Sequence, residues 1–180
     1  MNYDSLARDL RNKGIKVRKV KGWRQRGTGG SFTPRGVLFH HTASNAASGP
    51  APALGICTHG RVDLPGPLCQ FLVARDGTVY FVAAGRANHA GYGGPIKGIP
   101  QDSGNTYLFG VECENNGIGE PWREEQKRAV AILFALLLKR MKRGARMVIG
   151  HKEYTSRKID PNGIDLNAFR KRVQTVKRKL

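Results

Sequence analysis

The chain has 180 residues, a length that suits one well-buried domain and is short for two. Its 31 Lys and Arg against 13 Asp and Glu give a formal net charge of +18, so we expect a polyanionic partner such as nucleic acid, an anionic cell wall or a membrane surface. The cysteines are odd in number and lack C-x-x-C spacing, which argues against a disulfide framework and indicates synthesis in a reducing compartment.

Neither the N-terminus nor the interior predicts a targeting or membrane segment. Residues 1–8 contain no apolar stretch of the kind found in a secretory signal peptide. The longest apolar run, residues 129–138, has roughly half of the ~20 residues that a transmembrane helix needs. We therefore expect a protein that is made in a cytoplasm and does not insert into a membrane.

The first third of the chain alternates short elements with long connections. Apolar residues spaced four apart predict an amphipathic helix over residues 3–12. Residues 24–34 are basic and glycine-rich and predict a loop, which leads into a first core strand at 36–41. A long Ala, Gly and Pro-rich connection follows over residues 43–67, with one or two helical turns expected at 51–59; loops of this length are often functional.

The middle of the chain predicts a hairpin and one further strand. Two β-rich runs flank an Asp-Gly turn within residues 70–83, which is a strong hairpin signal. A second long, glycine-rich loop over residues 85–104 contains His89 and Tyr92. Residues 108–114 then alternate in the manner of a strand.

The last third predicts two helices around one more strand. Apolar residues between charged ends indicate a helix over 124–143 that packs on a sheet, followed by a strand over 147–151 and a final helix over 166–180. Strands and helices intermix without a regular βαβ repeat, so we expect the α/β (α+β) class, a central mixed β-sheet covered by helices. We expect residues 1–35 to form a basic N-terminal helix and loop that packs on a main domain of residues 36–180.

Two of the predicted strands end in histidine. A buried apolar run closes at His40 and His41, and a second closes at His151, so each delivers an imidazole to the end of a strand. Asp160 follows on a loop. Zinc accepts imidazole nitrogen and carboxylate oxygen, and three protein ligands with one position left for water form the catalytic arrangement. The spacing suggests a catalytic zinc site.

Five short motifs occur along the chain in a fixed order. They are Leu-Phe-His-His-Thr-Ala at 38–43, the hairpin Phe-Leu-Val-Ala-Arg-Asp-Gly-Thr-Val-Tyr at 71–80, His-Ala-Gly at 89–91, Phe-Gly-Val-Glu at 109–112, and Gly-His at 150–151 followed by Arg-Lys-Ile-Asp-Pro at 157–161. Together they resemble the zinc-dependent N-acetylmuramoyl-L-alanine amidases, the family shared by phage lysozyme-like amidases and peptidoglycan recognition proteins. The resemblance implies an amidase/peptidoglycan-recognition-like domain, with residues 36–180 as its zinc amidase catalytic part.

The resemblance implies that one Zn²⁺ per chain is held by His40, His151 and Asp160. Members of the family carry either aspartate or cysteine as the third ligand. Successive side chains of a strand face opposite sides, so only one of the two adjacent histidines can easily enter the site. The family register favours His40 over His41.

The resemblance also implies two catalytic groups. Glu112 matches the acidic residue that takes a proton from the activated water and later returns one to the leaving nitrogen. Glu114 lies two positions on, hence on the same face of the strand, and is the competitor if the register is shifted. Lys158 matches the family lysine that stabilises the oxyanion of the tetrahedral intermediate.

Three further residues are assigned to substrate binding: His41, His89 and Tyr92. Of these, His89 matches a family position that lines the substrate groove. One departure concerns a tyrosine that several members carry just before the hairpin strand, where this chain has Cys69. A thiol cannot reproduce the hydrogen bond of a phenol, so either another group such as Tyr92 or a water helps to position the substrate, or this role is absent.

The reaction implied by the resemblance is hydrolysis of the amide between N-acetylmuramic acid and the L-alanine of the peptidoglycan stem peptide. The lack of a signal peptide and the single domain favour a phage endolysin, held in the host cytoplasm until a holin-type partner releases it to the cell wall; murein recycling in the host is the other setting. The positive charge favours the endolysin, because it can bind anionic cell-wall polymers without a separate wall-binding domain. We expect a monomer.

Two other functions compete with this interpretation. A non-catalytic peptidoglycan-binding module would be expected if a metal ligand were lost, but all three candidates are present. A nucleic-acid-binding protein would explain the charge, but aromatic residues make up only 8% of the chain and no recognisable binding motif interleaves with the basic runs. We therefore expect no specific nucleic-acid partner.

Overall fold

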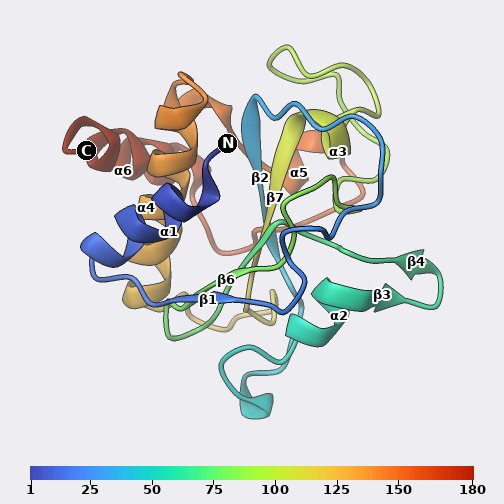
Figure 1. Cartoon of the computed structure of the whole chain (residues 1–180), viewed down its shortest axis with the longest axis horizontal. Helices are drawn as coiled ribbons and strands as arrows, with labels where there is room; N and C mark the ends of the chain where they lie inside the picture. Colours follow the sequence, from blue (N-terminus) through green and yellow to red (C-terminus); the bar gives the residue numbers. More distant parts are fainter.

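The computed structural model describes all 180 residues and contains a six-stranded sheet in the order β1-β6-β5-β7-β2-β8. Its strands are β1 (Val17–Lys19), β2 (Gly36–His41), β5 (Phe71–Val73), β6 (Val79–Phe81), β7 (Leu108–Cys113) and β8 (Val148–Gly150). Neighbouring strands run parallel except β5 and β6, which are antiparallel. The expected mixed sheet with covering helices is therefore confirmed (Figure 1).

Six α-helices and one small hairpin complete the fold. The helices are α1 (Tyr3–Asn12), α2 (Leu54–His59), α3 (Gly104–Tyr107), α4 (Glu124–Arg140), α5 (His151–Tyr154) and α6 (Leu166–Arg178), and single 3₁₀ turns occur at Ala46–Ser48 and Ala145–Met147. The hairpin pairs β3 (Gly60–Arg61) with β4 (Leu64–Pro65) apart from the main sheet. None of the helices has both the length and the apolar character needed to cross a bilayer.

The two central strands, β2 and β7, determine where the site lies. Both are almost entirely buried, as expected for parallel strands that are covered on both faces. They pair in parallel over six residues each, and the register sets His40 opposite Glu112. On the other side of β2, Phe39 pairs with Gly150 of β8. The carboxyl ends of β7, β2 and β8 therefore lie side by side, on the same side of the sheet.

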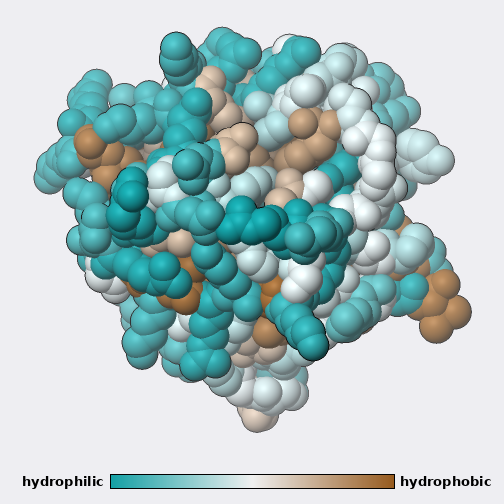
Figure 2. Space-filling model, viewed as in Figure 1, coloured by the Kyte–Doolittle hydropathy of each residue, from teal (hydrophilic) through white to brown (hydrophobic).

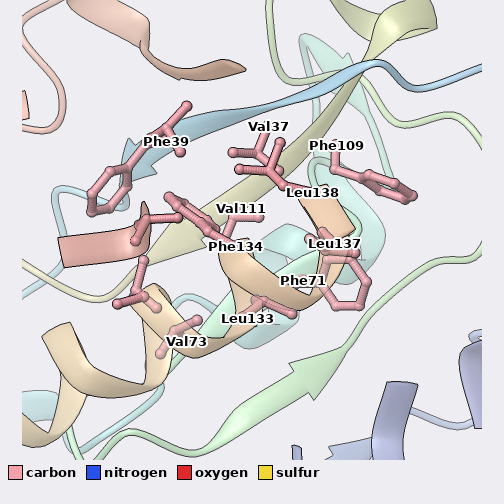
Figure 3. Close-up of a cluster of buried hydrophobic side chains, with 14 of the residues drawn as sticks. Val37, Phe39, Phe71, Val73, Phe109, Val111, Leu133, Phe134, Leu137 and Leu138 are labelled. Carbon is pink, nitrogen blue, oxygen red and sulfur yellow. The ribbon is translucent and has the colours of Figure 1, made fainter. Parts of the chain in front are cut away.

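A single large core joins the sheet to its helices. Helices α1, α4 and α6 gather on one side of the sheet, and the hairpin of β3 and β4 projects from another side with α2 at its base (Figure 1). Phe39 of β2 packs against Phe134 of α4 and Phe169 of α6, with ring centroids 5.2 Å apart in each pair. Figure 3 shows Phe39 and Phe134 among the aliphatic side chains of both layers.

The surface has the polar character that the composition predicts. In the view of Figure 2, hydrophilic residues cover most of the surface, and hydrophobic atoms stand out at the end of the hairpin formed by β3 and β4. Val62 lies in the turn of that hairpin and is fully exposed.

Most of the expected elements are present, with shifted ends. The helix expected over 124–143 ends at Arg140, because the backbone turns into the left-handed region at Lys142 (φ 54°). The final helix begins where the carboxylate of Asp165 accepts hydrogen bonds from the amides of Asn167 and Ala168. The helix over 3–12 and the hairpin about the Asp-Gly turn are both found.

The predicted end of one strand was wrong at His151, one of the candidate metal ligands. The strand expected over 147–151 ends at Gly150, and His151 is the first residue of α5. The carboxylate of Glu153 accepts a hydrogen bond from the Gly150 amide at 2.9 Å, which favours a helix start at this point. His151 is thus presented by the first turn of a short helix rather than by a strand.

The region before Gly36 contributes more structure than the sequence predicted. Leu6 and Leu10 of α1 belong to the main core, and the basic stretch after that helix forms β1, which pairs with β6 at the edge of the sheet. The signal for β1 is weak because the strand has three residues, two of them basic.

We expect Phe134→Ala to lower the free energy of unfolding by about 3–5 kcal/mol, because it removes a fully buried ring from the contact between α4, β2 and α6. Urea unfolding followed by circular dichroism measures this change. Lys171→Ala, on the exposed face of α6, is the control and should change stability by less than about 0.5 kcal/mol. Equal losses in the two variants would contradict the assignment of this core.

Candidate metal centre

Three side chains converge at the edge of the sheet where the carboxyl ends of the parallel strands meet. The Nδ1 atoms of His40 and His151 lie 3.0 Å apart, and each lies 3.0 Å from Oδ2 of Asp160. All three residues are buried, with His40 only 2% exposed. These are the residues that the sequence predicted as metal ligands.

Neighbouring elements bring the three residues together from distant parts of the chain. His40 is the fifth residue of β2, and His151 follows β8, which pairs with β2. Asp160 lies in the loop after α5, and its carbonyl oxygen accepts a hydrogen bond from the amide of Lys152 at 2.8 Å. The fold therefore places one ligand candidate near the end of β2, one at the start of the helix that follows the neighbouring strand β8, and one on the adjoining loop.

The arrangement fits a zinc ion. Zinc–ligand distances of about 2.0–2.1 Å in a tetrahedral site imply about 3.3 Å between neighbouring ligand atoms, close to the separations seen here. The outer nitrogen of each imidazole also has a partner: Nε2 of His151 lies 3.0 Å from the carbonyl oxygen of Ala90, and Nε2 of His40 lies 3.2 Å from Nδ1 of His89. Such outer contacts orient imidazole ligands in metal sites. His40, His151 and Asp160 can therefore hold a metal ion, and their donor set suits zinc.

The charge states of His40 and Asp160 agree with this role. Burial lowers the pKa of His40 to about 4, the charge of His151 acts in the same direction, and Asp160 opposes both. Burial raises the pKa of Asp160, but its contacts with the imidazoles of His151 and His40 outweigh burial, so this pKa lies below the usual range. At neutral pH, His40 is thus a neutral imidazole and Asp160 a carboxylate, the forms that bind metal ions.

Glu112 lies beside this group with one oxygen unsatisfied. Its Oε1 lies 4.0 Å from Nδ1 of His40, and its Oε2 is buried without a hydrogen-bond partner. Burial raises the pKa of Glu112 to about 8, and the charges of Asp160 and Glu114 add to this effect against that of Lys158. Because buried polar atoms are nearly always paired, the free oxygen marks a place where a polar group binds.

The alternative carboxylate, Glu114, is fully engaged elsewhere. One of its oxygens accepts hydrogen bonds from the hydroxyls of Thr42 and Ser44, and the other accepts one from the amide of Ala53 at 2.8 Å. Arg75 approaches it to 3.5 Å. Glu112, and not Glu114, is therefore the carboxylate beside the histidines and Asp160.

A buried arginine for which the sequence predicts no role connects two loops beside the site. Arg75 is 2% exposed and binds Glu120 through Nε and Nη2, at 2.6 and 2.9 Å. It also donates to the carbonyl oxygen of Ser44 at 2.8 Å. It thereby ties the loop after β2 to the loop after β7. Its only sequence signal is the Arg-Asp-Gly turn, which indicates a hairpin but not a buried cation.

The metal-ligand candidates open onto a groove. A cavity of about 480 Å³ contains His40, His151, Asp160 and Glu112 in its floor. Its walls come from loops, from α2 and from the hairpin of β3 and β4, and include the following residues: Arg61, Leu68, Ile118, Arg157, Lys158 and Ile159. Lys158 is exposed on this wall, and its charge acts on both His40 and Glu112.

The other residues expected to bind substrate occupy different positions. His41 is half-buried on the wall of the groove, where its Nδ1 accepts a hydrogen bond from the amide of Asn162 at 3.1 Å. Tyr92 is 73% exposed beside an adjoining hollow of about 320 Å³. His89 is buried behind His40 and borders the groove.

Cys69 does not face the groove. Its side chain is fully buried and packs with Cys57, Leu72 and Val82, whereas the preceding Leu68 lines the groove. Burial raises the pKa of the Cys69 thiol, which keeps it protonated. The position matched to the family tyrosine therefore contributes no hydrogen bond to the groove in this chain.

Comparisons with known proteins identify the family and the fold of the chain. The sequence matches the family described as N-acetylmuramoyl-L-alanine amidase over residues 30–163. A search of the curated proteins finds no match. Among solved structures, the endolysin amidase LysCS from Clostridium intestinale is 22% identical, with a TM-score of 0.61 over 88% of this chain and 95% of that chain.

Two further structures have the same fold. A mutant endolysin from Bacillus subtilis is 19% identical, with a TM-score of 0.66 over 88% of this chain and 99% of that chain. AmpDh3 from Pseudomonas aeruginosa, solved in complex with an anhydromuramic pentapeptide, is 19% identical, with a TM-score of 0.63 over 85% of this chain and 65% of that chain.

The family match covers most of the chain and includes the whole ligand group, from His40 on β2 to Asp160 after α5. The chain belongs to the N-acetylmuramoyl-L-alanine amidase family.

Proposed function

We propose that the protein is a zinc-dependent hydrolase of peptidoglycan that cleaves the amide between N-acetylmuramic acid and the L-alanine of the stem peptide. The observation that carries this proposal is the buried group of His40, His151 and Asp160 beside the unpaired oxygen of Glu112, at the floor of an open groove. Family membership supports the amide as the target bond. The peptidoglycan fragment bound in the AmpDh3 structure supports the substrate class.

The side chains around the groove have distinct roles in this reaction. His40, His151 and Asp160 would hold a zinc ion, which would supply Lewis-acid chemistry at the reacting amide. Glu112, whose carboxylate form a bound cation favours, accepts a proton from the attacking water and returns it to the nitrogen of the leaving L-alanine. The ammonium group of Lys158, on the groove wall, stabilises the negative charge that develops on the amide oxygen. Hydrolysis then leaves a muramoyl carboxylate and a free peptide amine.

We expect His40→Ala and Asp160→Ala each to abolish zinc binding and wall lysis, because each removes one of three ligands. Metal analysis of the purified protein and clearing of a suspension of purified peptidoglycan, with and without a chelator, measure the two effects. His59→Ala is the matched control, since His59 is exposed and lies outside the groove. Full activity of either ligand variant at stoichiometric zinc would show that the ligand assignment is wrong.

The same clearing experiment distinguishes the proposed amidase from the main alternative function. A non-catalytic peptidoglycan-binding module would bind the purified wall without clearing it, and a chelator would change nothing. The proposed amidase clears the suspension and stops when the metal is removed.

We expect Glu112→Gln to retain zinc and to lose about 10²–10⁴-fold in kcat, because the amide cannot accept the proton of the attacking water. Zinc content and turnover of a soluble muropeptide are the measurements. The combination distinguishes a proton-transfer group from a ligand: loss of zinc together with activity would assign Glu112 to the metal, and unchanged turnover would exclude it as the base.

We further propose that the protein acts as a phage endolysin. It would stay in the host cytoplasm as a monomer until a holin-type partner gives it access to the wall, and its charge of +18 would bind it to anionic wall polymers. Exposed basic residues on α6 and just beyond it, such as Lys171, Arg178 and Lys179, have no acidic partner within ion-pair distance. They are available to a polyanion.

We expect wall binding and lysis to fall steeply between about 0.1 M and 1 M salt, because the Debye length shrinks from about 10 Å to about 3 Å. Cosedimentation with purified walls measures binding. Turnover of a small soluble muropeptide is the control and should respond much less, since it does not depend on adhesion to a polymer. Wall binding that is independent of salt would contradict the electrostatic part of the proposal.

A further inference from the structure

One short segment lies behind both imidazoles of the metal centre. Nδ1 of His89 is 3.2 Å from Nε2 of His40, and the carbonyl oxygen of the next residue, Ala90, is 3.0 Å from Nε2 of His151. Two consecutive residues therefore contact the outer nitrogen atoms of the two histidine ligand candidates.

The hydrogen-bond partners determine where the protons lie. Nε2 of His89 is 3.2 Å from the carbonyl oxygen of Leu108, which can only accept, so this nitrogen carries a hydrogen. In a neutral imidazole only one nitrogen carries a hydrogen, and a buried ring without a carboxylate in contact is neutral. Nδ1 of His89 therefore has a free lone pair and accepts the hydrogen of His40 Nε2.

With the hydrogen on Nε2 of His40, the lone pair of Nδ1 is free to bind a cation placed between Nδ1, Oδ2 of Asp160 and Nδ1 of His151. The carbonyl oxygen of Ala90 selects the same tautomer in His151. The opposite tautomer of either ring would aim an N–H at the position of the metal and exclude it.

The surroundings hold the ring of His89 in this place. The side-chain oxygen of Asn105 accepts hydrogen bonds from the amides of His89 and Ala90, at 2.9 and 2.8 Å. On β7, the ring covers Gly110, where an added Cβ would lie 2.5 Å from the ring carbon Cγ. Only glycine at this position leaves room for the imidazole.

We propose that His89 is a positioning residue of the metal centre: by accepting the Nε2 hydrogen of His40, it holds His40 in the tautomer that binds the ion. This role is distinct from the substrate contact expected from the sequence. It rests on the proposed zinc site, but it does not depend on which amide the protein cleaves.

The first test compares two substitutions of different hydrogen-bonding capacity. His89→Leu fills the space without an acceptor and should weaken zinc binding by about 10–100-fold in a chelator competition. His89→Asn places an amide oxygen near the position of Nδ1 and should keep an affinity close to that of the parent. His59→Leu, at an exposed histidine, is the control for loss of an imidazole as such. Equal losses in the leucine and asparagine variants, or no loss in the leucine variant, would overturn the proposal.

Gly110→Ala tests the same role without changing any hydrogen-bonding side chain. Its methyl group would displace the ring of His89 from behind His40, so zinc affinity should fall as in His89→Leu. Zinc affinity equal to that of the parent would contradict the proposed contact.

Nuclear magnetic resonance of the ¹⁵N-histidine-labelled parent reads the tautomers directly. We expect the hydrogen on Nε2 of both His40 and His89 when zinc is bound. A hydrogen on Nδ1 of either ring would overturn the proposal even if every substituted protein failed to fold. A parent with these tautomers that binds zinc but does not cleave peptidoglycan would instead contradict the proposed function.

Discussion

Parallel pairing of β2 with β7 and β8 creates the site. Parallel strands end at the same edge of a sheet, so the residues at their carboxyl ends meet although they are far apart in the chain. The register sets His40 opposite Glu112 and brings the start of α5 next to β2. A shift of one residue would turn His40 away and bring in His41. The large aromatic core under β2 resists such a shift, because Phe39 would have to leave its contacts with α4 and α6.

Buried polar contacts hold the loops that the sheet alone would leave free. Arg75 joins the loops after β2 and β7 through Glu120 and Ser44, and Asn105 fixes the segment that contains His89. These contacts are strong in a low-dielectric interior, provided that every partner is satisfied. Glu112 is the exception, since one of its oxygens is buried and unpaired. The buried side chains around the site are thus paired except at the point where the proposed chemistry takes place.

Local sequence patterns were sufficient for the elements with strong signals, and the family resemblance pointed to the residues of the site. The hairpin, the long helix α4 and the apolar run of β2 follow from short-range patterns that burial reinforces. The alternation of side chains along β2 showed that only one of the two adjacent histidines enters the site. Local patterns failed at β1, because a strand of three residues gives only a weak signal. They also failed at His151, where the hydrogen bond from the Gly150 amide to the carboxylate of Glu153 favours the start of a helix.

Long-range packing selects which of several chemically equivalent groups acts at each point. His40 rather than His41 and Glu112 rather than Glu114 face the same point, because strand register is set between segments that are distant in sequence. The burial of His89 behind His40 depends on the absence of a side chain at Gly110 on another strand. The enclosure of Cys69 depends on its packing against α2 and β5. Residue types limit which reactions are feasible, but the direction and the partner of each side chain are properties of tertiary packing, which no local pattern contains.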